Sequence, residues 1–203
     1  MTTLTKNLIE FCIDEWNFFG AAEINLNNTI VDDGIKKEYQ DGPRQRIADY
    51  WKFIGGAYKN LNGADRGTPW SAAFISFAFH EANAGNKFPY SAGHARYINH
   101  AIKNTKNGIN SPLMGRKLKG YSIKAGDLIG FWRGDKRITF ENANRIGWYH
   151  SHTEIVIEVK NNYAYTIGGN VLHSVTRRQV RLNSQGHLVD RKKNWFVAIE
   201  NNL

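Results

Sequence analysis

The spacing of hydrophobic residues changes along the chain from helical to alternating. Over the first hundred residues, apolar side chains recur at helical spacing between polar loops. This pattern predicts helices over residues 5–18, from Pro43 to Gly55, from Thr68 to about Gly85, and from Ser91 to about Lys106. Residues 23–42 are rich in Asn, Asp and Gly, and we expect them to form a loop.

The remainder of the chain is typical of strands. Short apolar or alternating runs predict strands at residues 127–133, 152–159, 163–167, 175–181, 186–190 and 195–200. We expect residues 107–125 to form a connection. Helices followed by strands indicate an α+β fold, with N-terminal helices packed on a C-terminal antiparallel β-sheet. The 203 residues fit a single domain, with a helical part over about 1–106 and a sheet part over about 120–203.

Charge and composition narrow the classes of partner. The net charge is +9, and the Lys and Arg excess is concentrated after residue 100, which favours polyanionic surfaces such as cell-wall polymers. No nucleic-acid motif accompanies this charge, so we expect no specific nucleic acid partner. The lone Cys12 rules out an internal disulfide, and we expect it to be buried. We expect no transmembrane segment and, without a classical signal peptide, synthesis in the cytoplasm.

Ser71 is the first candidate for chemistry. Thr68 can cap a helix and Pro69 suits its first position, so Ser71 is expected in the first turn. Unpaired backbone N–H groups at a helix start favour a nucleophile or a developing oxyanion. The alternative is a small polar residue that allows close helix packing.

A base for this serine is predicted on the sheet. His150, His152 and Glu154 alternate on one face of a strand, and a turn at Asn161 places residue 152 opposite about 170. Asn170 is then expected to orient His152, which would activate Ser71. His150 is an alternative base. The same three strand residues could also form half of a metal site, but no metal-binding signature accompanies them, so we expect no metal or organic cofactor.

Several motifs occur together in a characteristic order. They are Glu-Trp-Asn-Phe-Phe-Gly at 15–20, Pro-Trp-Ser-Ala-Ala-Phe-Ile-Ser at 69–76, Phe-Pro-Tyr-Ser-Ala-Gly-His at 88–94, Lys-Ala-Gly-Asp-Leu-Ile at 124–129, Ser-His-Thr-Glu-Ile-Val at 151–156 and Thr-Ile-Gly-Gly-Asn-Val at 166–171. This ordered set resembles the DUF2272 family. That family in turn is similar to the NlpC/P60 and CHAP superfamily of papain-like peptidases and amidases.

The resemblance implies a papain-like fold and a set of roles. By position, it implies Ser71 as nucleophile, His152 as base and Asn170 as the residue that orients the base. We expect the substrate to be bound by Trp70, His94, His150 and Glu154. The superfamily typically cleaves peptide or amide bonds in peptidoglycan, which implies a cell-wall hydrolase. The protein would be a phage lysin or a secreted antibacterial effector acting as a toxin in the periplasm or cell wall, with a secretion apparatus or an immunity protein as partners.

The serine departs from the usual pattern of that superfamily, which has cysteine at this position. A hydroxyl is harder to ionise than a thiol, so a His–Asn pair suited to a thiolate activates it less well. Three interpretations follow: a natural serine hydrolase, an inactive module that binds peptidoglycan or another glycan, or a chain in which the cysteine was replaced.

Overall fold

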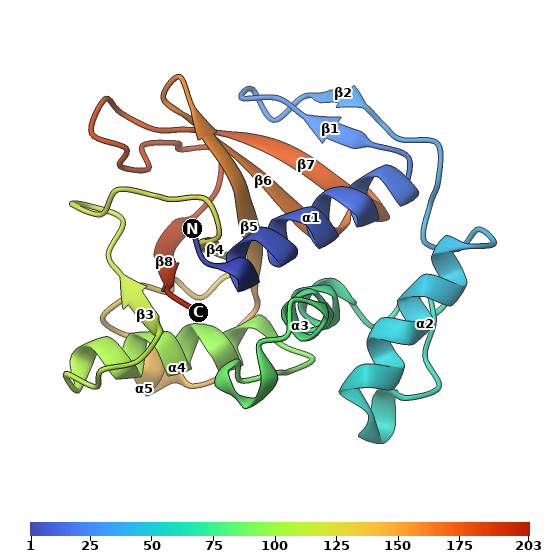
Figure 1. The fold of residues 1–203 in the computed structure, drawn as a ribbon, viewed down its shortest axis with the longest axis horizontal. Helices are drawn as coiled ribbons and strands as arrows, with labels where there is room; N and C mark the ends of the chain where they lie inside the picture. The colour runs from blue at the N-terminus through green and yellow to red at the C-terminus, as the bar shows by residue number, and fades with distance from the viewer.

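The computed structural model describes all 203 residues as an α+β fold, with helices packed on a mixed sheet (Figure 1). The helices are α1 (Thr3–Phe18), α2 (Pro43–Ile54), α3 (Ser71–Glu81), α4 (His94–Lys106) and α5 (Ala143–Ile146), with short 3-10 turns at Gly56–Tyr58 and Gly85–Lys87. The strands are β1 (Ala22–Ile24), β2 (Ile30–Asp32), β3 (Leu113–Arg116), β4 (Leu128–Trp132), β5 (Ser151–Lys160), β6 (Tyr163–Val171), β7 (Ser174–Arg181) and β8 (Trp195–Asn201). They form one sheet in the order β2-β1-β7-β6-β5-β4-β8-β3.

The predicted α+β class is confirmed, but the sheet is neither wholly C-terminal nor wholly antiparallel. The segment expected to be a loop, 23–42, contributes to β1 and supplies β2, and β1 runs parallel to β7. The expected connection 107–125 contains β3, and the strand predicted at 186–190 is reduced to an isolated bridge from Leu188 to Leu182. These short segments form because distant strands supply their partners, so local periodicity does not reveal them.

Alternation along the strands divides the apolar side chains between two clusters. Ile155 of β5 belongs to the main core beneath the helices, whereas its neighbour Val156 belongs to a smaller cluster with Leu182 and Leu188. Successive strand residues point to opposite faces, so both faces of the sheet are covered.

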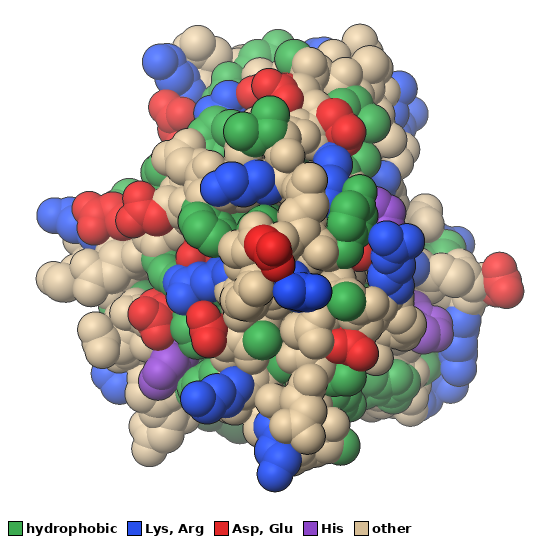
Figure 2. All heavy atoms as spheres, turned by 90° about the vertical axis from the view of Figure 1, so that its right-hand side faces the viewer, with side chains coloured by type: hydrophobic (Ala, Val, Ile, Leu, Met, Phe, Trp, Pro, Cys, Tyr) green, Lys and Arg blue, Asp and Glu red, His purple; other side chains and the backbone are tan.

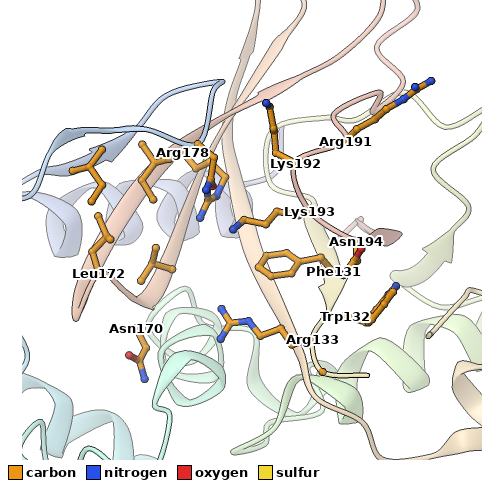
Figure 3. Close-up of a pocket in the computed structure, with 15 residues that line it drawn as sticks. Phe131, Trp132, Arg133, Asn170, Leu172, Arg178, Arg191, Lys192, Lys193 and Asn194 are labelled. Atoms are coloured by element: carbon orange, nitrogen blue, oxygen red, sulfur yellow. The ribbon is translucent and has the colours of Figure 1, made fainter. Parts of the chain in front are cut away.

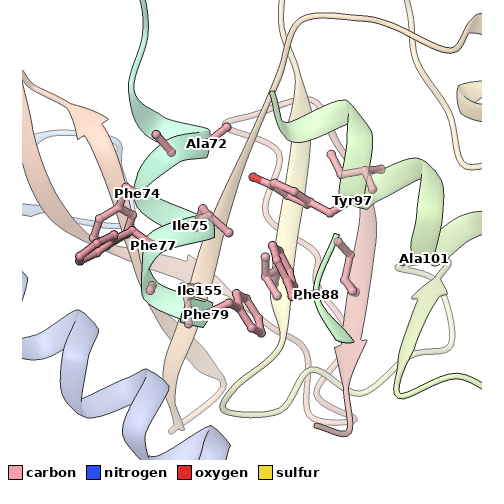
Figure 4. Close-up of a cluster of buried hydrophobic side chains, with 14 of the residues drawn as sticks. Ala72, Phe74, Ile75, Phe77, Phe79, Phe88, Tyr97, Ala101 and Ile155 are labelled. Carbon is pink, nitrogen blue, oxygen red and sulfur yellow. The ribbon is translucent and has the colours of Figure 1, made fainter. Parts of the chain in front are cut away.

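Helix α3 lies at the centre of the main core. Every residue from Ser71 to Phe79 is buried, and the helix packs against β5 and β6 on one side and against α1 and α2 on others. Figure 4 shows Ile75 and Phe79 on the side of α3 that faces Phe88 and Ile155 of β5, whereas Phe74 and Phe77 point to the opposite side of the helix. A helix that is apolar nearly all round is stable only when it is enclosed in this way.

The two ends of the chain meet beside the sheet (Figure 1). Thr2 caps α1 by accepting a hydrogen bond from the backbone N–H of Thr5 (3.1 Å), and the Thr2 hydroxyl donates to the carbonyl oxygen of Leu203. Cys12, further along α1, is fully buried, as predicted. None of the helices combines the length and apolar character that a membrane span requires.

Acidic and basic side chains are interspersed over the side of the molecule that carries α2 (Figure 2). Lys37 pairs with Asp33 and Arg44 with Asp41, both at 2.8 Å. The net positive charge is therefore not gathered into one continuous patch on this side.

A buried ionic cluster joins α1 to α2. The Glu15 carboxylate is 5% exposed and accepts hydrogen bonds from Arg46 Nε (2.8 Å) and from the Tyr50 hydroxyl. A buried carboxylate requires such partners, because losing its hydration is costly unless the charge is compensated.

We expect the Arg46→Met substitution to lower the free energy of unfolding by about 3 kcal/mol, because it leaves the Glu15 charge buried with a single donor. Urea denaturation measures this loss. Arg44→Met is the matched control, since its ion pair with Asp41 is exposed and should contribute no more than about 1 kcal/mol. Equal losses in the two variants would contradict a special role for the buried cluster.

Candidate active site

The site is built at the N-terminus of α3. The helix begins at Ser71 with Trp70 as its N-cap, and no side chain caps it, so the predicted cap at Thr68 is wrong. Ser71 does lie in the first turn, as predicted. The first intrahelical hydrogen bond runs from the Phe74 N–H to the Trp70 carbonyl (2.9 Å). The N–H groups of the three preceding residues therefore have no intrahelical acceptor.

Ser71 is hydrogen-bonded to a histidine, but to a different one from that predicted. Its Oγ lies 2.7 Å from His94 Nε2, at the start of α4, and both residues are about 5% exposed or less. The expected hydrogen bond between Ser71 and His152 is not formed. The first turns of α3 and α4 approach each other and bring His94 to the serine, and strand alternation alone could not predict this contact.

The other ring nitrogen of His94 is also held. His94 Nδ1 lies 2.9 Å from Thr153 Oγ1 on β5 and is hydrogen-bonded to the Tyr97 hydroxyl, one turn along α4. The Thr153 and Tyr97 hydroxyls are themselves 3.1 Å apart. Burial raises the pKa of Tyr97 well above its usual range, so this side chain remains a neutral phenol. The imidazole is thus oriented by hydroxyl groups and by no carboxylate.

His152 lies directly behind His94. The two ring centroids are 5.1 Å apart, His152 is fully buried, and neither of its ring nitrogens has a hydrogen-bond partner. Its Nε2 is 3.7 Å from Glu154, which instead accepts a hydrogen bond from Arg178 Nε (3.0 Å). His152 and Glu154 share a buried side of β5, as predicted, whereas His150 precedes the strand and is exposed.

Asn170 does not reach His152. The pairing of Ile155 with Ile167 fits the predicted register, which would place residue 152 opposite 170. Beyond this point β6 is irregular: its pairing with β7 shifts after Gly168, and Asn170 has a φ of 56°. Asn170 therefore makes no hydrogen bond to His152 and instead lines a cavity next to the site.

Trp70 is anchored by a carboxylate that the sequence analysis missed. The indole N–H donates to Glu38 Oε2 (2.7 Å), and Glu38 Oε1 lies 2.9 Å from His173 Nδ1. Trp70 is 2% exposed and stacks on Phe19, with ring centroids 5.8 Å apart. In this arrangement Trp70 positions the start of α3. Glu38 gave no signal in the sequence because it lies in a polar segment that we expected to be a loop.

Burial keeps both histidines neutral at ordinary pH. It lowers the pKa of His94 well below its usual range, and the nearby His152 and Arg133 lower it further. Burial likewise lowers the pKa of His152, with Arg133, Arg178 and Lys193 adding to the shift. A neutral His94 can accept a proton, as a general base must.

The metal alternative finds no support in the geometry. No group of three or more His, Cys, Asp or Glu side chains is placed to hold a metal ion. The half-site considered in the sequence is divided, because His150 is exposed while His152 and Glu154 are buried.

The family profile described as "Uncharacterized protein conserved in bacteria (DUF2272)" matches residues 39–200. The chain belongs to the DUF2272 family. The match confirms the predicted family and includes Ser71, His94, His152 and Asn170, whereas α1, β1 and β2 precede it. No curated protein and no solved structure matches the chain.

The buried histidines of this DUF2272 domain should make its stability depend on pH. Below about pH 6.5 the unfolded chain binds protons that the native histidines exclude, so the free energy of unfolding should fall as pH falls. We expect His152→Gln to reduce the slope of this dependence by up to about 1.4 kcal/mol per pH unit between pH 6 and pH 5, as measured by urea denaturation.

His150→Gln is the control for this prediction, because the exposed His150 side chain is removed without altering the buried pair. An unchanged slope in His152→Gln would show that His152 is protonated in the native protein.

Proposed function

We propose that this protein is a papain-like hydrolase that cleaves a peptide or amide bond in bacterial peptidoglycan, with Ser71 as its nucleophile. The observation that carries the proposal is the 2.7 Å contact between Ser71 Oγ and His94 Nε2 at the start of a buried helix. The resemblance of the chain's motifs to the NlpC/P60 and CHAP superfamily supports the reaction class and the substrate.

In the proposed mechanism His94 is the general base. With its proton on Nδ1 donated to Thr153, its Nε2 accepts the hydroxyl proton as Ser71 Oγ attacks the scissile carbonyl. Backbone N–H groups at the start of α3 stabilise the oxyanion. His94 then returns the proton to the leaving amine, and a water molecule hydrolyses the acyl-enzyme with the same base.

His152 remains the alternative base. Its role as base was predicted from the strand pattern and from the family resemblance, and its ring lies 5.1 Å from that of His94. The direct hydrogen bond to Ser71 favours His94 as the base. In that case His152 packs against His94 without a hydrogen bond to Ser71. The two assignments of the base, His94 or His152, therefore predict different effects of substituting each histidine.

The place of action is part of the proposal. Cleavage of peptidoglycan requires delivery to the periplasm or cell wall, as a phage lysin or as a secreted antibacterial effector with an immunity protein in the producing cell. The net charge of +9 would help to retain the protein at an anionic envelope.

We expect the protein to release defined fragments from purified peptidoglycan, identified by mass spectrometry. Ser71→Ala should lower the rate by at least about 10³-fold, because it removes the nucleophile. His94→Ala should cause a comparable loss, whereas His152→Phe should retain most of the activity. A loss in His152→Phe that exceeds the loss in His94→Ala would reverse the assignment of the base.

A matched substitution separates the catalytic proposal from its alternative. Activity only in Ser71→Cys would indicate that the site is suited to a thiolate. If neither the unmodified protein nor Ser71→Cys hydrolyses peptidoglycan, and Ser71→Ala still binds it, the inactive binding module would be favoured. The absence of a carboxylate beside His94 is the structural feature that favours this second candidate, since no acid stabilises the imidazolium.

A further inference from the structure

A cavity of about 670 Å³ opens beside the candidate site. Its walls come from the β1–β2 hairpin, the end of β4, the turn between β6 and β7, and the segment that precedes β8 (Figure 3). Asn170, the residue expected to orient the base, is one of its lining residues.

The lining is strongly cationic. Five of its fifteen residues are basic, none is acidic, and the basic ones are Arg133, Arg178, Arg191, Lys192 and Lys193. Figure 3 shows Arg133 and Lys193 extending toward Arg178, whereas Arg191 points away. Arg133 and Lys193 thus contribute positive charge to the same space.

Only one of these three converging cations is neutralised by the protein. Arg178 donates to the buried Glu154 (3.0 Å) and to Asn28 (2.7 Å). Arg133 and Lys193 form no ion pair, and the Phe131 ring lies close to both, at 5.3 Å from Arg133 Cζ and 5.8 Å from Lys193 Nζ. Their donors are left for a ligand.

The cations are held together at an electrostatic cost. Burial lowers the pKa of Lys193, and the neighbouring Arg178 lowers it further. Burial also lowers the pKa of Arg133, where Glu154 acts in the opposite direction. A bound anion would relieve this repulsion, and the planar guanidinium groups match the geometry of carboxylate and phosphate.

The positive charge of the cavity acts on the serine–histidine pair. Arg133 lowers the pKa of both His94 and His152, so its charge acts on the catalytic imidazole itself. Phe131, which lines the cavity, has its ring centroid 5.2 Å from that of His152, and His152 is next to His94. Phe131 and His152 therefore connect the wall of the cavity to the serine–histidine pair.

We propose that this cavity binds an oxyanionic group, a carboxylate or a phosphate, that anchors the substrate next to Ser71. The position relative to the scissile bond rests on the proposed hydrolase function, whereas anion binding does not. The group would accept hydrogen bonds from Arg133 and Lys193, with Arg178 completing the positive wall of the cavity.

Calorimetric titration of the purified protein tests the anion site with inorganic pyrophosphate and, separately, with citrate. We expect Arg133→Met combined with Lys193→Met to weaken binding at least ten-fold. The control combines Lys6→Met with Lys119→Met, which removes the same charge from two exposed, unpaired lysines outside the cavity and should change the affinity less than two-fold. Tighter binding of pyrophosphate identifies a phosphate site, and tighter binding of citrate a carboxylate site.

Equal weakening in both double variants, or no binding by the unmodified protein, would overturn the proposal. Peptidoglycan digestion supplies the second readout: the cavity variant should raise KM for peptidoglycan at least ten-fold more than the control variant does. Anion binding without hydrolysis would support the anion site and contradict the proposed hydrolase function. Hydrolysis with unchanged KM in the cavity variant would reject the anchoring role alone.

Discussion

The close approach of β6 to the first turn of α3 is the constraint on which the site depends. A Cβ atom at Gly169 would lie 2.7 Å from Phe74 and Trp70, and one at Gly168 would lie 2.9 Å from His152 and Glu154. Any side chain at these two positions would push the strand away from the helix or from β5. Because both positions are glycines, β6 can pack directly against the first turn of α3, which contains Ser71, while α4 supplies His94.

The helices and the main strands could be predicted from the sequence because each carries its own periodicity. Helix α2 begins at Pro43 and ends before Gly55, and β5 and β6 are joined at the Asn161–Asn162 turn, where both residues have positive φ. The β1–β2 hairpin could not be predicted in this way. All three residues of β2 are exposed, and β1 depends on β7, more than 140 residues later.

In the candidate site, the position of Ser71 could be predicted from the sequence, but its hydrogen-bond partner could not. Ser71 lies in a first helical turn, as the local sequence predicts, but its hydrogen bond to His94 depends on how the first turns of α3 and α4 approach each other. The predicted pairing of residue 152 with 170 follows the strand register correctly as far as Ile155 and Ile167. It fails where β6 becomes irregular, since alternation gives no warning of such a local distortion. The cationic cavity could not be predicted from the sequence either, because its basic residues come from segments that are far apart in the chain.

The arrangement of the chain also bears on how the protein is made. Helix α1 packs on β5, β6 and β7, and β1 joins the sheet beside β7, so these segments are completed only by strands that are synthesised much later. A ribosome-bound chain can pack α1 against α3, but it cannot bury the side of α1 that faces the sheet until β7 has emerged. The side of α1 that faces the sheet therefore stays without its partners while the segments between α1 and β5 are being synthesised.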